Sequence, residues 1–243
     1  MADEVVIDHR FRGPPASANG GYTCGLLARA LEAPAAEVNL RAPPPLAKPL
    51  RLERDGQAAR LLDGDRPVAD ARALPGVDAR LPEPPPLDAA AGADPGFSYF
   101  GEDHPFRECF VCGLARTPGD GLRIHPAPLE DSGLVACVWI PDAGLAGGDG
   151  AVAEEIAWGA LDCPGGIAAH HFARSDATMV LARLRGTLLR PITLEEPHIV
   201  VGWPDGSEGR KHHAGTAIFD RDGEPVAYSG ALWIELREAP RID

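Results

Sequence analysis

The feature that most constrains the fold is a pattern that occurs twice along the chain. Each half predicts a strand, a glycine-containing loop, one helix and then about four antiparallel strands. Between the halves, residues 75–105 are rich in proline with an Ala/Gly run, which predicts a linker or a surface crossover. The pattern indicates an α+β chain with a first unit at residues 1–74 and a second at residues 106–243. Two unrelated α+β units are the alternative.

The predicted elements follow from periodicity and turn signals. Apolar residues at helical spacing predict one helix at 22–32, ended by Pro34, and another at 152–163, ended by Pro164-Gly165-Gly166. Strands are expected at 5–11, 36–42, 48–54, 57–62, 66–73, 122–125, 134–140, 179–190, 197–203, 214–220 and 225–236. Small residues in both helices would let each helix lie close against a sheet.

Charge and composition exclude several classes of protein. The chain has 23 Lys+Arg against 36 Asp+Glu, a formal charge of −13, which argues against a nucleic-acid binder and against attraction to anionic membranes. No apolar stretch is long enough for a membrane span, and the acidic N-terminus does not resemble a signal peptide. Five cysteines, an odd number, favour reduced thiols and a cytoplasmic location. The scarcity of lysine suggests a GC-rich bacterial gene.

Three motifs resemble segments of known proteins. Residues 13–22, GPPASANGGY, look like the loop and helix start of acyl-CoA thioesterase II-like proteins. The run Cys109-Phe110-Val111-Cys112-Gly113, followed by Gly121-Leu122-Arg123, resembles the start of single-hotdog phenylacetate-pathway thioesterases. Ala160-Leu161-Asp162 resembles the helix segment that carries their catalytic aspartate. The chain thus resembles the double-hotdog acyl-CoA thioesterases of the thioesterase superfamily. The resemblance implies a tandem double hotdog, with antiparallel sheets that each wrap one long central helix.

The two halves depart from the family pattern in complementary ways. Such thioesterases often begin the helix with His-Gly-Gly and carry an acidic residue nine positions after that histidine. The first unit has Asn19-Gly20-Gly21, but Ala28 stands at the acidic position. The second unit has Asp162, but Ala153-Glu154-Glu155 stands where His-Gly-Gly is expected. Each unit alone would therefore lack one part of the site.

The complementary losses predict one composite site between the units. A free amide of Gly20 or Gly21 at a helix N-terminus could polarise a thioester carbonyl, and the carboxylate of Asp162 could attack it or activate a water. Asn19 is expected to bind substrate beside them. The equivalent place, between Ala28 and Glu154-Glu155, is expected to be filled or to lack converging polar groups.

Other candidates have simpler explanations. Glu154 and Glu155 fit the first turn of a helix, where acidic residues suit the dipole. Cys163 is expected to be a small buried side chain, and the pairs His170-His171 and His212-His213 to be exposed. Cys109 and Cys112 with His104 could be half of a zinc site, but a second close pair of ligands is absent. The sequence therefore predicts no metal and no cofactor.

The predicted activity is hydrolysis of acyl thioesters, with acyl-CoA as the expected substrate. Arg210-Lys211 is the one Arg-Lys neighbour pair in the chain and could bind the CoA phosphates, although a solvated hairpin explains it as well. The alternatives are a non-catalytic acyl or acyl-CoA binding hotdog protein and a hotdog dehydratase or hydratase. No nucleic acid or membrane partner is expected, and a homo-oligomer is possible in the superfamily that the chain resembles.

Overall fold

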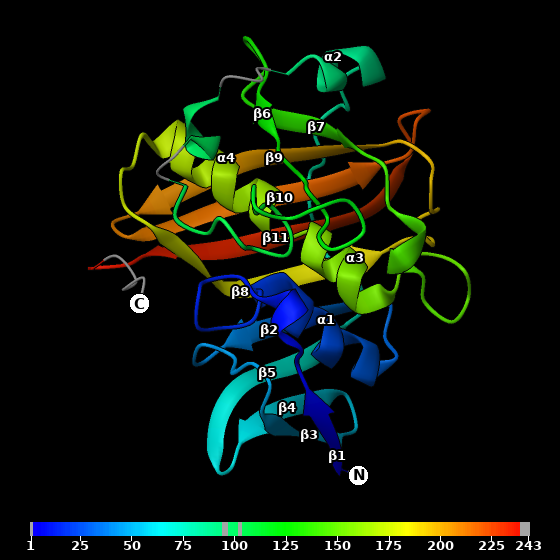
Figure 1. The fold of residues 1–243 in the computed structure, drawn as a ribbon, viewed down its shortest axis with the longest axis vertical. Coiled ribbons are helices and arrows are strands. Elements are labelled where there is room, and N and C mark those ends of the chain that lie inside the picture. Colours follow the sequence, from blue (N-terminus) through cyan, green and yellow to red (C-terminus); the bar gives the residue numbers. More distant parts are fainter. Residues whose placement is uncertain (1, 94–96, 102–103, 239–243) are drawn as a thin grey trace.

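One antiparallel sheet of eleven strands runs through the computed structural model (Figure 1). The structure describes residues 2–93, 97–101 and 104–238. The strand order is β1-β3-β4-β5-β2-β8-β11-β10-β9-β7-β6. The strands are β1 (Ala2–Val6), β2 (Ala35–Leu40), β3 (Pro49–Asp55), β4 (Ala58–Asp63), β5 (Arg66–Leu74), β6 (Ala127–Pro128), β7 (Val135–Trp139), β8 (Met179–Leu188), β9 (His198–Glu208), β10 (Lys211–Phe219) and β11 (Pro225–Glu235).

The two halves of the chain meet where β2 pairs with β8. Ala36 lies opposite Gly186 and Val38 opposite Leu184, so the ladder continues from the first half into the second. Glu37 at this junction is buried and forms ion pairs with Arg72 of β5 and Arg185 of β8. The sheet and one apolar core both extend across the junction. The division at residues 74 and 106 stays a prediction.

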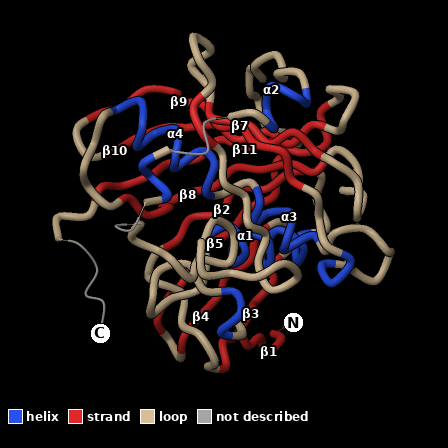
Figure 2. The backbone as a smooth tube through the Cα atoms, turned by 45° about the horizontal axis from the view of Figure 1, so that its top comes forward, coloured by secondary structure: helices blue, strands red, loops and turns tan. Residues whose placement is uncertain are grey.

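Three helices, α1, α3 and α4, pack against the sheet and against one another. In Figure 1, α1 (Gly20–Leu31) lies by β2 and β5, and α4 (Cys163–Ala173) crosses β9 and β10. Between them, α3 (Glu154–Ala160) packs on α1. The tube view in Figure 2 shows the same central group of helices from another angle.

Glycine allows α1 and α3 to approach closely. A Cβ added at Gly25 would lie 2.5 Å from the Cα of Glu155, and one added at Gly21 would lie 2.7 Å from the carbonyl oxygen of Trp158. Real Cβ atoms do not come this close to backbone, so larger residues would push the helices apart. The small residues of the first helix were expected to face a sheet. Two of them, Gly21 and Gly25, instead face α3.

Most predicted strands are present within a few residues, but the second helix differs from its prediction. The segment 152–163 contains α3 and then a break at Leu161 and Asp162, after which α4 begins. Pro164 was expected to end a helix, but it lies in the first turn of α4, where its missing N–H needs no partner. The prediction mistook a helix start for a helix end.

Two other segments also differ. Residues 122–125 form no strand, and the strand 5–11 is replaced by β1 and a 3-10 turn, η1 (His9–Phe11). The linker contains a short helix, α2 (Leu87–Ala91), and a 3-10 turn, η2 (Ser98–Phe100). Residues 94–96 and 102–103 of that predicted linker lie outside the described residues. A further 3-10 turn, η3 (Ala143–Leu145), precedes α3. Over the described ranges, no helix is both long and apolar enough to cross a membrane.

Candidate active site

The carboxylate of Asp162 lies at the break between α3 and α4. Its backbone, at φ −86° and ψ −80°, departs from helical geometry, and the residue is the N-cap position of α4. The residue is only 2% exposed. The sequence suggested a position near a helix C-terminus, because the predicted helix ended at residue 163 and α4 was not predicted. A buried carboxylate needs hydrogen-bond partners to offset its lost hydration.

These partners come from the first half of the chain. Asp162 Oδ2 accepts a hydrogen bond of 2.8 Å from the backbone N of Gly21 and one of 2.9 Å from Nδ2 of Asn19. Gly21 is the second residue of α1, so its N–H belongs to the first turn, where backbone donors have no partner inside the helix. The structure therefore brings together the two segments that the sequence predicts to meet, Asn19-Gly20-Gly21 and Asp162.

The two adjacent glycines differ in what they contact. A Cβ at Gly21 would lie 2.5 Å from the Cβ of Asp162, so only glycine allows this approach. A Cβ at Gly20 would instead face the side chains of Leu181 and Leu40, each at 3.0 Å. Of the two glycines, Gly21 is the one whose backbone amide has a described hydrogen bond to Asp162.

Both polar atoms of the Asn19 side chain form hydrogen bonds with other residues of the protein. Its Oδ1 accepts from the N of Tyr22 at 2.9 Å and caps α1, which is the usual role of asparagine at a helix start. Its Nδ2 donates to Asp162 and lies 3.8 Å from the sulfur of Cys109. The sequence predicts Asn19 as a substrate-binding residue, whereas these contacts describe a residue that orients the carboxylate.

Burial dominates the electrostatics of this carboxylate. It raises the pKa of Asp162 to about 7, and the nearby Cys109 adds to the increase. The hydrogen bonds from Gly21 and Asn19 act in the opposite direction, because they stabilise the charged form. The other oxygen, Oδ1, is buried without a hydrogen-bond partner among the described residues. Asp162 thus has one oriented oxygen and one free oxygen.

A cavity of about 620 Å³ is lined by Cys163, the residue next to Asp162 in the chain. Its buried lining includes Cys112 and Cys163, and Cys163 directly follows Asp162. Tyr99 of η2 also lines it, and burial raises the pKa of Tyr99 well above its ordinary value. Sequence reasoning missed Tyr99, because it lies in the proline-rich segment that was predicted to be a linker.

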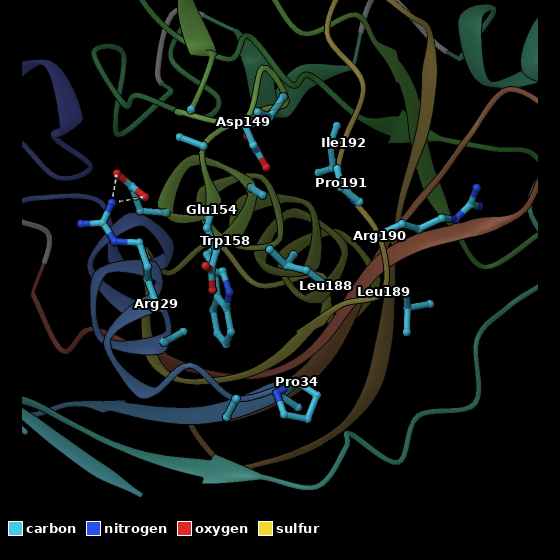
Figure 3. A pocket seen from close by; sticks show the side chains of 18 of the residues that line it. Arg29, Pro34, Asp149, Glu154, Trp158, Leu188, Leu189, Arg190, Pro191 and Ile192 are labelled. Carbon is cyan, nitrogen blue, oxygen red and sulfur yellow. Dashed lines mark hydrogen bonds and ion pairs between the residues drawn. The ribbon is translucent and has the colours of Figure 1, made fainter. Parts of the chain in front are cut away.

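The equivalent place on the other side of the helix pair contains a second cavity, of about 540 Å³ (Figure 3). Ala28, Glu154 and Trp158 line it, so this place is not filled, and only the other predicted possibility, a lack of converging polar groups, remains. Burial, and then the neighbouring Glu155, raise the pKa of Glu154. Glu155 itself forms an ion pair with Arg29, drawn as dashed lines in Figure 3. A carboxyl group is therefore present here, but it is not held by a helix-start amide as Asp162 is.

Arg210 and Lys211 line neither of these two cavities. Arg210 lies in the turn between β9 and β10 and donates to the backbone oxygen of Glu235 at 2.7 Å. Lys211 is exposed at the start of β10. Their role in binding CoA phosphates stays a prediction.

The histidine pairs are less exposed than the sequence suggests. His212 is buried and lies 3.0 Å from the carboxylate of Glu235. His170 and His171 are half-buried, line the 620 Å³ cavity and pack against the rings of Tyr99 and Phe97. The expectation of exposed positions is wrong for these three and for the half-buried His213. Rings at 97–99 cover His170 and His171, and His212 lies opposite Trp233 in the sheet.

The sequence of the chain matches no known family profile and no curated protein. Its structure resembles a tesB protein of Mycobacterium avium subspecies paratuberculosis, with a TM-score of 0.61 and 14% identity over 97% of this chain and 93% of that chain. It also resembles an acyl-CoA thioesterase II from Mycobacterium marinum, with a TM-score of 0.60 and 14% identity over 98% and 93% of the two chains.

A third similar structure is a conserved protein of unknown function with a hot dog fold from Alicyclobacillus acidocaldarius. Its TM-score is 0.60, and 14% of residues are identical over 99% of this chain and 94% of that chain. These three matches cover nearly the whole length of this chain and of each similar chain. The resemblance to hotdog thioesterases that the sequence motifs carry is therefore confirmed at the level of the fold.

Proposed function

We propose that this protein hydrolyses acyl thioesters, and acyl-CoA in particular, at the site formed by Asp162 and the start of α1. The observation that carries the proposal is the hydrogen bond from Gly21 N to Asp162 Oδ2, at 2.8 Å, between residues from the two halves of the chain. It joins a carboxylate to a helix N-terminus, which are the two groups that thioester hydrolysis needs. We interpret the fold accordingly as a tandem double hotdog with one composite site.

The chemistry assigns a different task to each oxygen of Asp162. Oδ2 is oriented by Gly21 and Asn19, and Oδ1 is free to take a proton from a water. The water oxygen attacks the thioester carbonyl, the C–S bond breaks, and the departing thiolate takes the proton from Asp162. The products are a carboxylic acid and a free thiol.

The start of α1 would stabilise the negative charge on the carbonyl oxygen. Backbone N–H groups and the helix dipole both favour an anion at this position. In the structure, Gly21 N–H is bonded to Asp162, so the thioester oxygen must take over this donor when substrate binds. Gly21 thus positions the carboxylate before substrate binds and polarises the carbonyl afterwards, while Asn19 keeps its hydrogen bond to Oδ2.

The substrate class is proposed from the adjacent cavity. Its lining has aromatic and apolar side chains around Cys112 and Cys163, and it also has polar ones, with Arg174 and Asp176 both on it. Such a cavity suits an acyl chain or a pantetheine arm, with its polar end toward solvent. The names of two structurally similar proteins, tesB and acyl-CoA thioesterase II, favour the same class of substrate.

One observation favours the binding-protein alternative. Asp162 is 2% exposed, so the carboxylate is closed off from bulk water in this conformation. A non-catalytic acyl-binding protein would keep the cavity without using the carboxylate. A dehydratase or hydratase is less well supported, because no histidine is among the hydrogen-bond partners of Asp162 in the described part of the chain.

The test is release of free thiol from a panel of acyl-CoAs that covers short, long and aromatic acyl groups. Purified protein is expected to release CoA with saturation kinetics on at least one of these. Tight binding of acyl-CoA without thiol release would replace hydrolysis by the binding function. If the protein neither binds nor hydrolyses any acyl-CoA of the panel, both the hydrolase function and the binding function are rejected.

A further inference from the structure

We propose that this chain binds one zinc ion, or a similar thiophilic divalent metal, through Cys109, Cys112, Cys163 and His104. The three sulfur atoms lie within 4.8 Å of one another, and all three residues are buried. His104 is also buried, and its Nε2 lies 3.9 Å from the sulfur of Cys112. The metal would be structural, since these four ligands complete its coordination.

The distances suit a tetrahedral ion. Zinc binds thiolates at about 2.3 Å, so two thiolates on one tetrahedral zinc are about 3.8 Å apart. The sulfurs of Cys109 and Cys163 are 3.8 Å apart, which is far longer than a disulfide bond. All five cysteines are free thiols. The three sulfur atoms are therefore close enough to share one ion, and a movement of the His104 ring past the Cys112 sulfur would add the fourth ligand.

The backbone around Cys109 has the form of a metal-binding turn. Cys109 and Cys112 have the Cys-x-x-Cys spacing that is common at zinc sites, in a turn of the chain. Gly113 N closes the turn on the Cys109 carbonyl at 2.9 Å. A Cβ at Gly113 would lie 2.5 Å from that same oxygen, so the turn depends on glycine.

His104 supplies an observation independent of the thiols. Its Nδ1 is buried with no hydrogen-bond partner in the described ranges, and its Nε2 has only the Cys112 sulfur. The rings of Tyr99 and Phe100 pack against it at 5.2 and 5.4 Å and keep the surroundings apolar. Coordination through Nε2 would give this buried ring a strong partner in place of its weak contact with the Cys112 sulfur.

The sequence prediction of no metal rested on the absence of a second close pair of ligands. The fold supplies the missing ligand from Cys163, 54 positions after Cys109. A metal here would fasten the turn 109–112 to the first residue of α4, next to Asp162 and Asn19. The metal would then hold Asp162, the neighbour of Cys163 in the chain, through a crosslink that the sequence spacing does not reveal.

Metal analysis of the purified full chain tests this directly. Protein prepared without chelator is expected to contain about one zinc per chain. Cys109→Ser, Cys163→Ser and His104→Ala are expected to lose it, whereas Cys24→Ser and Cys137→Ser, which change buried cysteines outside the cluster, are expected to keep it. A zinc content that is unchanged in Cys163→Ser would overturn the proposal.

A cobalt titration of the chelator-treated wild-type chain provides a second readout that needs no variant. Tetrahedral cobalt with three thiolates is expected to give sulfur-to-cobalt charge-transfer bands together with intense visible d–d bands, saturating at about one equivalent. Absence of these bands, with all five thiols reactive after unfolding, would contradict the proposal. So would a Cys109–Cys163 disulfide found by mass spectrometry in freshly purified protein. None of these readouts depends on thioesterase activity.

Discussion

The side-chain amide of Asn19 donates a 2.9 Å hydrogen bond to the carboxylate of Asp162, 143 positions later in the chain. The same side chain caps α1 through its oxygen. One residue therefore fixes both the start of the helix and the direction of the carboxylate beside it. The geometry of the candidate site depends on this double contact.

Replacement of Asn19 by alanine should affect stability and turnover together. Loss of the cap should cost about 0.5–2 kcal/mol in the free energy of unfolding. The carboxylate would also lose one of its two donors, so kcat should fall while KM changes little. Chemical denaturation and steady-state kinetics measure the two effects. Asn19→Ser keeps a capping oxygen and is the matched control, because it should recover stability but not turnover. Equal kcat values in the wild type and Asn19→Ala would rule out a positioning role.

Gly21→Ala should disturb the site more than any other glycine substitution in the helices named here. The new Cβ would lie 2.5 Å from Asp162 Cβ and 2.7 Å from the Trp158 carbonyl oxygen, so α1 must move away from α3. Overpacking of this kind typically costs about 1–3 kcal/mol. Gly230→Ala in β11 is the control, since nothing lies within 4 Å of its added Cβ. A Gly21→Ala protein that is as stable and active as Gly230→Ala would contradict the close approach.

Local patterns predicted the strands and the first helix well, because turn residues and periodicity act over a few positions. The meeting of Asp162 with Asn19 and Gly21 was also predictable, since the Gly pair and the acid were each missing from one half. The break at Leu161 and Asp162 was not, because Pro164 can either end a helix or begin one. The cluster of Cys109, Cys112 and Cys163 was not predictable either, since no local spacing reveals that packing brings Cys163 of α4 to the turn at 109–112.

The junction between β2 and β8 should weaken in acid. Burial alone raises the pKa of Glu37, but hydrogen bonds from Arg72 and Arg185 outweigh it and leave the pKa below its ordinary value. A carboxyl group with a lowered folded pKa contributes stability above its unfolded pKa, and that contribution disappears as the pH falls through the folded value. Glu37→Gln should thus cost about 1–2 kcal/mol near neutral pH and little at strongly acidic pH.

Denaturant unfolding of Glu37→Gln and the wild type over an acidic to neutral pH series measures this difference. Glu53→Gln is the control, because Glu53 pairs with Arg51 on an exposed part of β3. A stability difference for Glu37→Gln that stays constant with pH would show that the ion pairs at the junction do not contribute as described.

The most direct test of the central claim is kcat for thiol release by Asp162→Asn, measured on the best acyl-CoA substrate of the wild type. Asn preserves the volume of the side chain but cannot accept the proton of the attacking water, so kcat should fall by about 10²–10⁴. Glu154→Gln, which removes the carboxyl group in the other cavity, should retain wild-type kcat. If Asp162→Asn turns over at the wild-type rate, or if Glu154→Gln is the variant that loses activity, the composite site at Asp162 and Gly21 is not where the chemistry occurs.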